Sequence, residues 1–311
     1  MLLNVIHETT YRYAPPAKTA QHMAHLRPLD DARQRLLRHR LAITPTPVLQ
    51  DESLDVYGNS RAFFSLQSGH DALRIVADSL VATSLPPVPE NDAGWEDGSW
   101  ERARERMRYH RDAAYDPAAE FIFPSPHVPR HSNFADYARP CFGPGASLLA
   151  SARALMTRIH EDFSYATDAT DVSTPALEAL QMRRGVCQDF AHVMLGCLRS
   201  LGLPARYVSG YLLTRPAPGQ PRLVGSDASH AWVSVYLPAP DGAGAWTELD
   251  PTNNRAPGED YVVLARGRDY ADVSPVRGVL HGGAHHHLRV GVTVLPLAEM
   301  PAPAPAAPTI V

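Results

Sequence analysis

A segment that opens with a cysteine, residues 187–202, is the strongest structural signal in this 311-residue sequence. Apolar residues recur in it at steps of four, three and four, which is the spacing of one helix face: Phe190, Met194, Cys197 and Leu201. Cys187 stands three residues before Phe190, so it lies in the first turn on the same inward face. A helix with one apolar face needs a sheet to cover, and the chain must supply one.

Alternating apolar and polar residues after this helix supply that sheet, in four segments: 206–213, 230–237, 245–251 and 288–297. The second half therefore predicts an α+β domain with an antiparallel sheet. Residues 1–83 hold short alternating segments separated by turns such as Tyr57-Gly58-Asn59. This pattern predicts an N-terminal antiparallel β-sandwich or small barrel.

Pro, Gly, Asp and Asn cluster over residues 85–98, which is typical of a linker. We therefore expect a β domain at 1–90, a second domain at 91–298 and a Pro/Ala-rich, polyproline-like tail at 299–311. The tail contributes nothing to either core.

Charge and cysteine content exclude several classes of function. Lys and Arg number 29 against 33 Asp and Glu, so the positive field of a nucleic-acid-binding protein is missing. No run approaches the ~20 apolar residues of a membrane span, and the first residues lack the positive region of a signal peptide. Three cysteines cannot build a disulfide framework. We expect a cytoplasmic protein with no nucleic-acid or membrane partner.

The cysteine has a placement that favours reactivity, because the free N–H groups of a helix N-terminus favour a thiolate. A cysteine nucleophile also needs a histidine and a third group that orients it. His230 and Asp250 are the candidates, since both lie at one end of two strands joined by a Pro/Gly-rich loop. An even register, for example Tyr236 opposite Trp246, puts both on one face, whereas an odd register separates them. The loop length leaves both registers open.

Other interpretations of these residues remain open at this point. A cysteine on an apolar stripe is often only a core residue, and the same three side chains could instead bind zinc. Asn253 and Asn254 are alternatives to Asp250 in the orienting role. Four histidines could gather a metal, although a solvated loop is the better interpretation: His281, His285, His286 and His287. Three residues of the helix have expected structural roles: Asp189, His192 and Cys197.

Three motifs in order make the chain recognisable. RGVCQDFAHVMLGCLRSLGLPARYVSGYL, ASHAWVSVYLP and WTELDPTN together resemble the bacterial transglutaminase-like cysteine enzyme superfamily, as does GRDYADVSPVRG at 267–278. The N-terminal half is similar to the β domain of that family. The resemblance implies a papain-like α+β core, with Cys187, His230 and Asp250 at the catalytic Cys, His and Asp positions and no cofactor.

The sequence departs from animal transglutaminases in one respect. Those enzymes carry a Trp upstream of the Cys as an oxyanion donor, and no Trp lies there in this chain: the four are Trp95, Trp100, Trp232 and Trp246. The backbone N–H of Cys187 can supply one donor, and Tyr165, in Phe163-Ser164-Tyr165, is the candidate for the second.

The resulting hypothesis is an acyl-transfer enzyme that attacks amide bonds of a protein or peptide substrate through an acyl-thioester. A cysteine peptidase or amidase with the same three residues is the first alternative. A non-catalytic binding module of the same fold is the second, although such proteins typically lose one of the three residues. The sequence predicts no oligomeric state.

Overall fold

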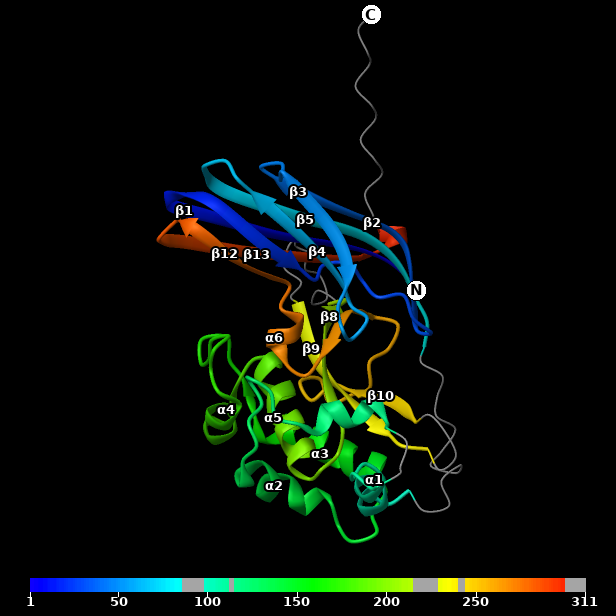
Figure 1. Ribbon diagram of the computed structural model, residues 1–311. Coiled ribbons are helices and arrows are strands. Elements are labelled where there is room, and N and C mark those ends of the chain that lie inside the picture. The colour runs from blue at the N-terminus through cyan, green and yellow to red at the C-terminus, as the bar shows by residue number, and fades with distance from the viewer. Residues whose placement is uncertain (86–97, 112–114, 215–228, 240–243, 300–311) are drawn as a thin grey trace, which may run out of the picture.

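The computed structural model describes residues 1–85, 98–111, 115–214, 229–239 and 244–299. Figure 1 shows a broad β layer above a helical layer, with a small sheet between them. Most of the expected linker, the domain boundary at residue 90 and all but the first residue of the expected tail lie outside the described residues. In the part of the chain that is described, no helix is both long and apolar enough to cross a membrane.

Within the described residues, seven antiparallel strands form the upper layer, here called the large sheet: β1 (Leu2–Ala24), β2 (Gln34–Thr44), β3 (Leu49–Leu54), β4 (Ser60–Leu66), β5 (His70–Thr83), β12 (Val276–Gly282) and β13 (His285–Pro296). The order is β2-β5-β1-β4-β3, and β12 and β13 pair with the other edge of β1. The first half of β1 pairs with β5 and β13, and its second half pairs with β4 and β12. Phe64, Leu73 and Ile75 are fully buried in the core of this layer.

The placement of β13 corrects the prediction that residues 288–297 belong to the sheet of the second half. Val294 pairs with Val5 of β1, so residues 276–296, expected in the second domain, lie in the large sheet. Alternation identifies a strand but not its partner, and this partner comes from the opposite end of the chain. The strand that takes the expected place, Tyr261–Gly267, was missed because its residues 261–265 are apolar without a break.

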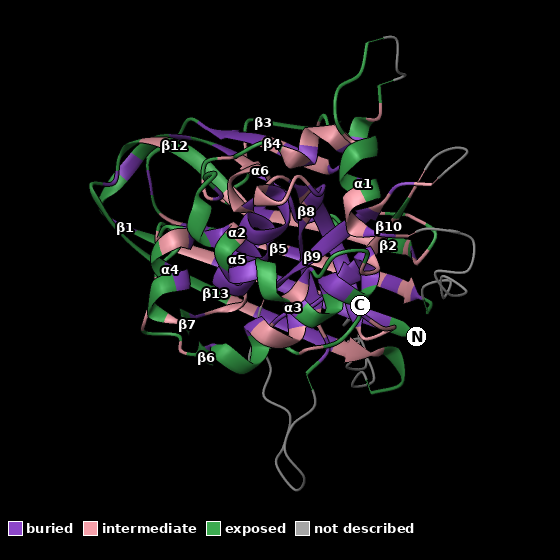
Figure 2. Cartoon of the chain, turned by 90° about the horizontal axis from the view of Figure 1, so that it is seen from below, coloured by how far each residue is buried: buried purple, intermediate pink, exposed green. Residues whose placement is uncertain are grey.

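Four described strands form the small sheet, in the order β10-β9-β8-β11: β8 (Ala205–Leu212), β9 (Ser229–Leu237), β10 (Ala245–Leu249) and β11 (Tyr261–Gly267). The mixed architecture with antiparallel sheets agrees with the predicted α+β class. Helix α5 (Cys187–Ser200) covers this sheet, and Figure 2 shows it buried among its neighbours. It is buried nearly all round, polar residues included, because α2 (Ser132–Ala138), α3 (Leu148–Asp162) and α4 (Ala176–Met182) pack against its outer side.

Short elements complete the lower layer. The α-helices are α1 (Trp100–Arg106), α2 (Ser132–Ala138), α3 (Leu148–Asp162), α4 (Ala176–Met182) and α6 (Tyr270–Val273). The 3-10 helices are η2 (Pro117–Ile122), η3 (Arg139–Cys141) and η4 (Leu297–Glu299), and β6 (Ser164–Tyr165) pairs with β7 (Arg184–Gly185). Gly196 of α5 lies so close to the Phe134 ring of α2 that a side chain there would displace the ring. Helix α5 is therefore the central element of this layer.

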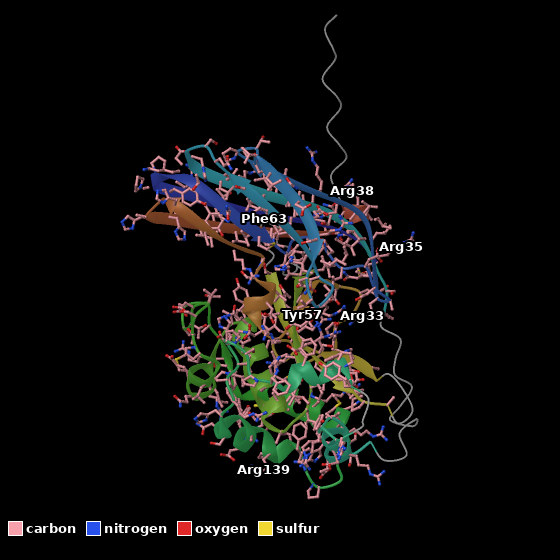
Figure 3. All side chains as sticks on the ribbon, viewed as in Figure 1. Arg33, Arg35, Arg38, Tyr57, Phe63 and Arg139 are labelled. Atoms are coloured by element: carbon pink, nitrogen blue, oxygen red, sulfur yellow. The ribbon has the colours of Figure 1, made fainter. Side chains whose placement is uncertain are left out.

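Polar contacts join the large sheet to the small one. The Gln34 side chain forms two hydrogen bonds with the backbone of Val263, at 2.7 and 2.8 Å, and so pairs with the outer edge of β11. Arg33 forms a 2.6 Å ion pair with Glu248, and both side chains are largely buried. Figure 3 shows Arg33 at the level where the two layers meet. These contacts hold the two sheets in one relative position.

Candidate active site

Cys187 is the first residue of α5, and its turn is held by the residues on either side. The Asp189 carboxylate accepts a 2.8 Å hydrogen bond from the backbone N–H of Val186, which is an N-capping interaction. Gly185 has φ of 155°, and a side chain there would collide with the Asp189 carboxylate. Asp189 thus has the structural role predicted for it. The Cys187 Sγ lies 4.0 Å from the carbonyl oxygen of Ser229, the residue before His230.

The β9–β10 register brings His230 and Asp250 together. Trp246 pairs with Tyr236, so the register is the even one, and both side chains lie on one face. The His230 Nε2 lies 2.7 Å from the Asp250 Oδ2. The geometry that the sequence left conditional is therefore present.

Asp250 is completely buried and has several donors. Its Oδ2 accepts hydrogen bonds from the Asn253 amide and the Tyr261 hydroxyl, each at 2.7 Å. Its Oδ1 accepts bonds from the backbone N–H groups of Thr252 and Asn253, at 2.9 and 3.2 Å. Burial acts to raise the pKa of Asp250, but the hydrogen bond and charge of His230, with the side-chain bonds of Asn253 and Tyr261, lower it. The group is a carboxylate at neutral pH.

The two asparagines proposed as alternatives have different positions. The Asn253 Nδ2 lies 3.3 Å from the His230 Nε2, farther than the carboxylate, and it donates to Asp250. Asn254 accepts a hydrogen bond from Thr157 instead. Asp250 therefore has the shorter contact with the imidazole, and Asn253 supports that carboxylate.

The environment of His230 favours a charged imidazole. Burial acts to lower the pKa of His230, but hydrogen bonds with Asp250 and Cys187, and the charges of both groups, raise it to about 10. The side chain is 9 % exposed, so little water screens these interactions. An imidazolium beside the Cys187 thiol is thus the stable form near neutral pH.

A pocket of about 240 Å³ contains both Cys187 and His230. One wall comes from the small sheet and its helices, with Gln188, Tyr207 and Tyr270. The opposite wall comes from the large sheet, and its residues are His7, Thr9, Tyr11, Val276, Leu288 and Val290. A larger cavity of about 690 Å³ lies against α1 and the end of α5, but none of the predicted site residues lines it. The smaller pocket is the relevant one, because the reactive groups open into it.

Tyr165, the predicted second oxyanion donor, lies near this site but does not line the pocket. It lies in β6, where it pairs with Gly185 of β7, and the residue is 55 % exposed. Burial and the charge of Cys187 raise the pKa of Tyr165. Its role stays a prediction. The indole N–H of Trp232 is used elsewhere, since it donates to Glu248.

The remaining candidates have structural surroundings. His192 is fully buried, accepts a hydrogen bond from the Tyr270 backbone and stacks on His127, and Cys197 is fully buried in the core. The four histidines of the expected loop are exposed but belong to β12 and β13, so that part of the interpretation is wrong: His281, His285, His286 and His287. Among described residues, no group of three or more metal-ligating side chains is present, and the zinc alternative gains no support.

Two residues of the site are not predicted by the sequence patterns. Tyr261 donates to Asp250, and the turn at Pro257-Gly258 before an apolar run could have indicated its strand. His7 lies on the opposite wall of the pocket, 2.9 Å from the Tyr211 hydroxyl. These residues are 204 positions apart, and no local pattern relates them.

Known proteins and a solved structure resemble this chain. An uncharacterized protein of Mycobacterium tuberculosis is 40 % identical over 293 residues, covering 94 % of this chain and 92 % of that protein. A protein-glutamine gamma-glutamyltransferase of Pseudomonas aeruginosa is 30 % identical over 154 residues, covering 47 % of this chain and 22 % of that protein. The crystal structure of a candidate cysteine protease from Cytophaga hutchinsonii shares the fold, with a TM-score of 0.71 at 20 % identity over 96 % of this chain and 91 % of that one.

Two family models match the two layers of the molecule. Residues 3–82 match the bacterial transglutaminase-like N-terminal region, which forms most of the large sheet. Residues 135–251 match the transglutaminase-like superfamily and include Cys187, His230 and Asp250. With a 40 % identical relative covered almost end to end, this chain belongs to the transglutaminase-like superfamily.

Proposed function

We propose that this protein is a thiol-dependent acyl-transfer enzyme that acts on amide bonds of proteins or peptides through Cys187, His230 and Asp250. One observation carries the proposal: a buried histidine, 2.7 Å from a buried carboxylate, shares a pocket with a cysteine at a helix N-terminus. That combination supplies a nucleophile, a proton carrier and a group that orients the carrier.

The reaction follows from which atoms are engaged. The His230 Nε2 bonds to Asp250, so Nδ1 is the nitrogen left to exchange a proton with the thiol. The thiolate attacks the substrate carbonyl, the imidazolium protonates the leaving amine, and an acyl-thioester forms. Asp250 keeps the ring oriented and stabilises its positive charge. The backbone N–H of Cys187 donates to the oxyanion, and Tyr165 is the proposed second donor.

The acyl-thioester then has two fates. Attack by an amine completes a transamidation, and attack by water completes the hydrolysis of a peptidase or amidase. The named activity of the Pseudomonas aeruginosa relative supports transamidation. Incubation with Gln- and Lys-containing peptides plus a free amine, followed by mass spectrometry, separates amine-adduct, deamidated and cleaved products.

Replacement of the cysteine tests the nucleophile. Cys187→Ala should abolish turnover and leave the fold intact. Cys197→Ala is the matched control: the same deletion in the core should cost ~1 to 2 kcal/mol of unfolding free energy and leave turnover in place. Turnover by Cys187→Ala at the wild-type rate would contradict the proposal. A stable protein with no turnover and slow iodoacetamide labelling would favour the binding module.

Lys content gives a further test of transamidation. The chain has seven Gln but a single Lys, Lys18, which is exposed within β1. A Gln–Lys transamidase incubated alone should form at most short covalent oligomers, and Lys18→Arg should nearly abolish them, because Arg stays protonated. Long polymers that persist in Lys18→Arg would exclude this chemistry, and a hydrolase would form none in either variant.

The cytoplasm remains the proposed compartment. The described cysteines are all free thiols, which fits a reducing environment. Fractionation of the native host, with a periplasmic or secreted marker as control, tests this proposal, and recovery with that marker would contradict it.

A further inference from the structure

We propose that the large sheet contributes to substrate selection in the active site. Strands β1 and β13 form the outer wall of the pocket, and this wall selects substrates in which the side chain beside Cys187 is uncharged. The inference rests on the proposed function, since it takes Cys187 as the reacting group. It assigns a role to the N-terminal region, which carries none of the three proposed catalytic residues.

The wall is continuous because two strands build it side by side. Thr9 of β1 pairs with Val290 of β13, and Tyr11 pairs with Leu288, so alternate residues of both strands face the pocket. Thr9 is buried at 2 % exposure, whereas Leu288 and Val290 are each 47 % exposed at the rim. A substrate group that occupies the pocket beside Cys187 therefore contacts this wall.

Among the described residues, those that line this pocket include no Asp, Glu, Lys or Arg. Its two histidines differ: burial lowers the pKa of His7 to about 4, whereas the charged ring of His230 is already paired with the Asp250 carboxylate at 2.7 Å. His7 lies between two hydroxyl groups, at 2.9 Å from Tyr211 and 3.0 Å from Thr9, and neither is a counter-ion. A charged substrate group would lose its hydration and find no opposite charge on this wall.

The size of the pocket agrees with a single side chain. At about 240 Å³ it is smaller than the ~300 to 1,000 Å³ of pockets that hold drug-sized ligands. The wall is also fixed in place, because His7 bonds across to Tyr211 of β8 and Arg33 pairs with Glu248 of β10. Selection by shape and charge therefore needs no movement of the large sheet.

Alkylation of Cys187 in the full chain measures access without a known substrate. The three probes have similar size and different charge: neutral iodoacetamide, anionic iodoacetate and cationic 2-bromoethylamine. The variants Val290→Asp and Val290→Lys place a charge on the wall at a half-exposed position that tolerates it. His287→Asp and His287→Lys are matched controls, because His287 is exposed on the same strand but three residues away, on the opposite face.

We expect Val290→Asp to slow iodoacetate about tenfold relative to iodoacetamide and to speed 2-bromoethylamine, with the reverse for Val290→Lys. The His287 variants should change these ratios less than about twofold. Leu288→Asp repeats the test at the neighbouring rim position and should match Val290→Asp. The proposed role of the wall would be wrong if charges at Val290 and at His287 changed the labelling ratios equally, or if neither changed them.

Failure of the wall and failure of the proposed function give different results. If the wild-type Cys187 reacts no faster than an ordinary thiol and Cys187→Ala keeps its turnover, the proposed function fails. If wild-type labelling is fast but independent of charges at Val290 and Leu288, the function stands and the wall is wrong. Circular dichroism of each variant confirms that the ratios come from folded protein.

Discussion

The two walls of the pocket each carry a buried histidine, and their surroundings drive the two pKa values in opposite directions. His230 lies 2.7 Å from a carboxylate and has its pKa raised to about 10. His7 lies between two hydroxyl groups, and burial lowers its pKa to about 4. Near neutral pH one ring is therefore charged and the other neutral, although both are almost out of contact with water.

The difference teaches that the partner, rather than burial, decides what a buried histidine can do. Burial opposes the charged form of both rings, and only His230 has partners that compensate for it, Asp250 first and Cys187 second. The charged ring can hold a proton for a leaving amine, whereas the neutral ring can only donate one hydrogen bond and accept another. One pocket thus combines a wall suited to proton transfer with a wall suited to uncharged groups.

The largest effect should come from making His230 resemble His7. Asp250→Asn keeps a hydrogen-bond partner but removes the charge, so turnover should fall by ~10³ to 10⁴. In the wild type, kcat/KM should decline only as pH rises through about 10, where His230 loses its proton. In Asp250→Asn the decline should move to much lower pH, because burial then dominates. An unchanged pH profile in this variant would show that Asp250 does not hold the proton on His230.

Acid should destabilise the fold through His7. Above pH 6.5 the ring is neutral in both the folded and unfolded states, and the group contributes nothing to the pH dependence. As pH falls from 6.5 toward 4, the unfolded chain binds a proton that the folded state refuses, so unfolding free energy falls by about 2 to 3 kcal/mol. His7→Gln should reduce the total loss by this amount, and the remaining loss belongs to other buried histidines whose pKa burial lowers, such as His22 and His192. Urea unfolding at pH 7 and 4.5 measures the loss, with exposed His287→Gln as the control that keeps the full loss.

The reverse conversion should make His7 resemble His230. Thr9→Asp places a carboxylate beside the His7 ring, 3.0 Å away at the present hydroxyl, and should raise the pKa of His7 from about 4 toward 6.5 or above. Thr9→Asn has the same shape without the charge and should leave the pKa near its present value. Titration of the ring by NMR measures both, and equal values in the two variants would refute the role of the charge.

The smallest effect should come from a residue that supports Asp250. Tyr261→Phe removes one of the donors to the carboxylate but leaves its charge, so turnover should fall by about tenfold. Asn253→Ala removes another donor and should behave alike. A larger loss in Asn253→Ala than in Asp250→Asn would transfer the orienting role to the asparagine.

Local sequence patterns predicted several elements of the lower layer. The steps of four, three and four predicted α5 with Cys187 in its first turn, and alternation predicted the strands of His230 and Asp250. These signals are local because a helix or strand face repeats within a few residues. The motif order also identified the family, which the family models confirm.

Tertiary structure decided the rest. The register with Trp246 opposite Tyr236, the pairing of β13 with β1, the position of Tyr261 and the approach of His7 to Tyr211 all depend on contacts between distant segments. Alternation states which side chains share a face, but a strand pairs through backbone groups that every residue carries. The choice of partner is made by the packing of the whole core, and with it the second wall of the pocket.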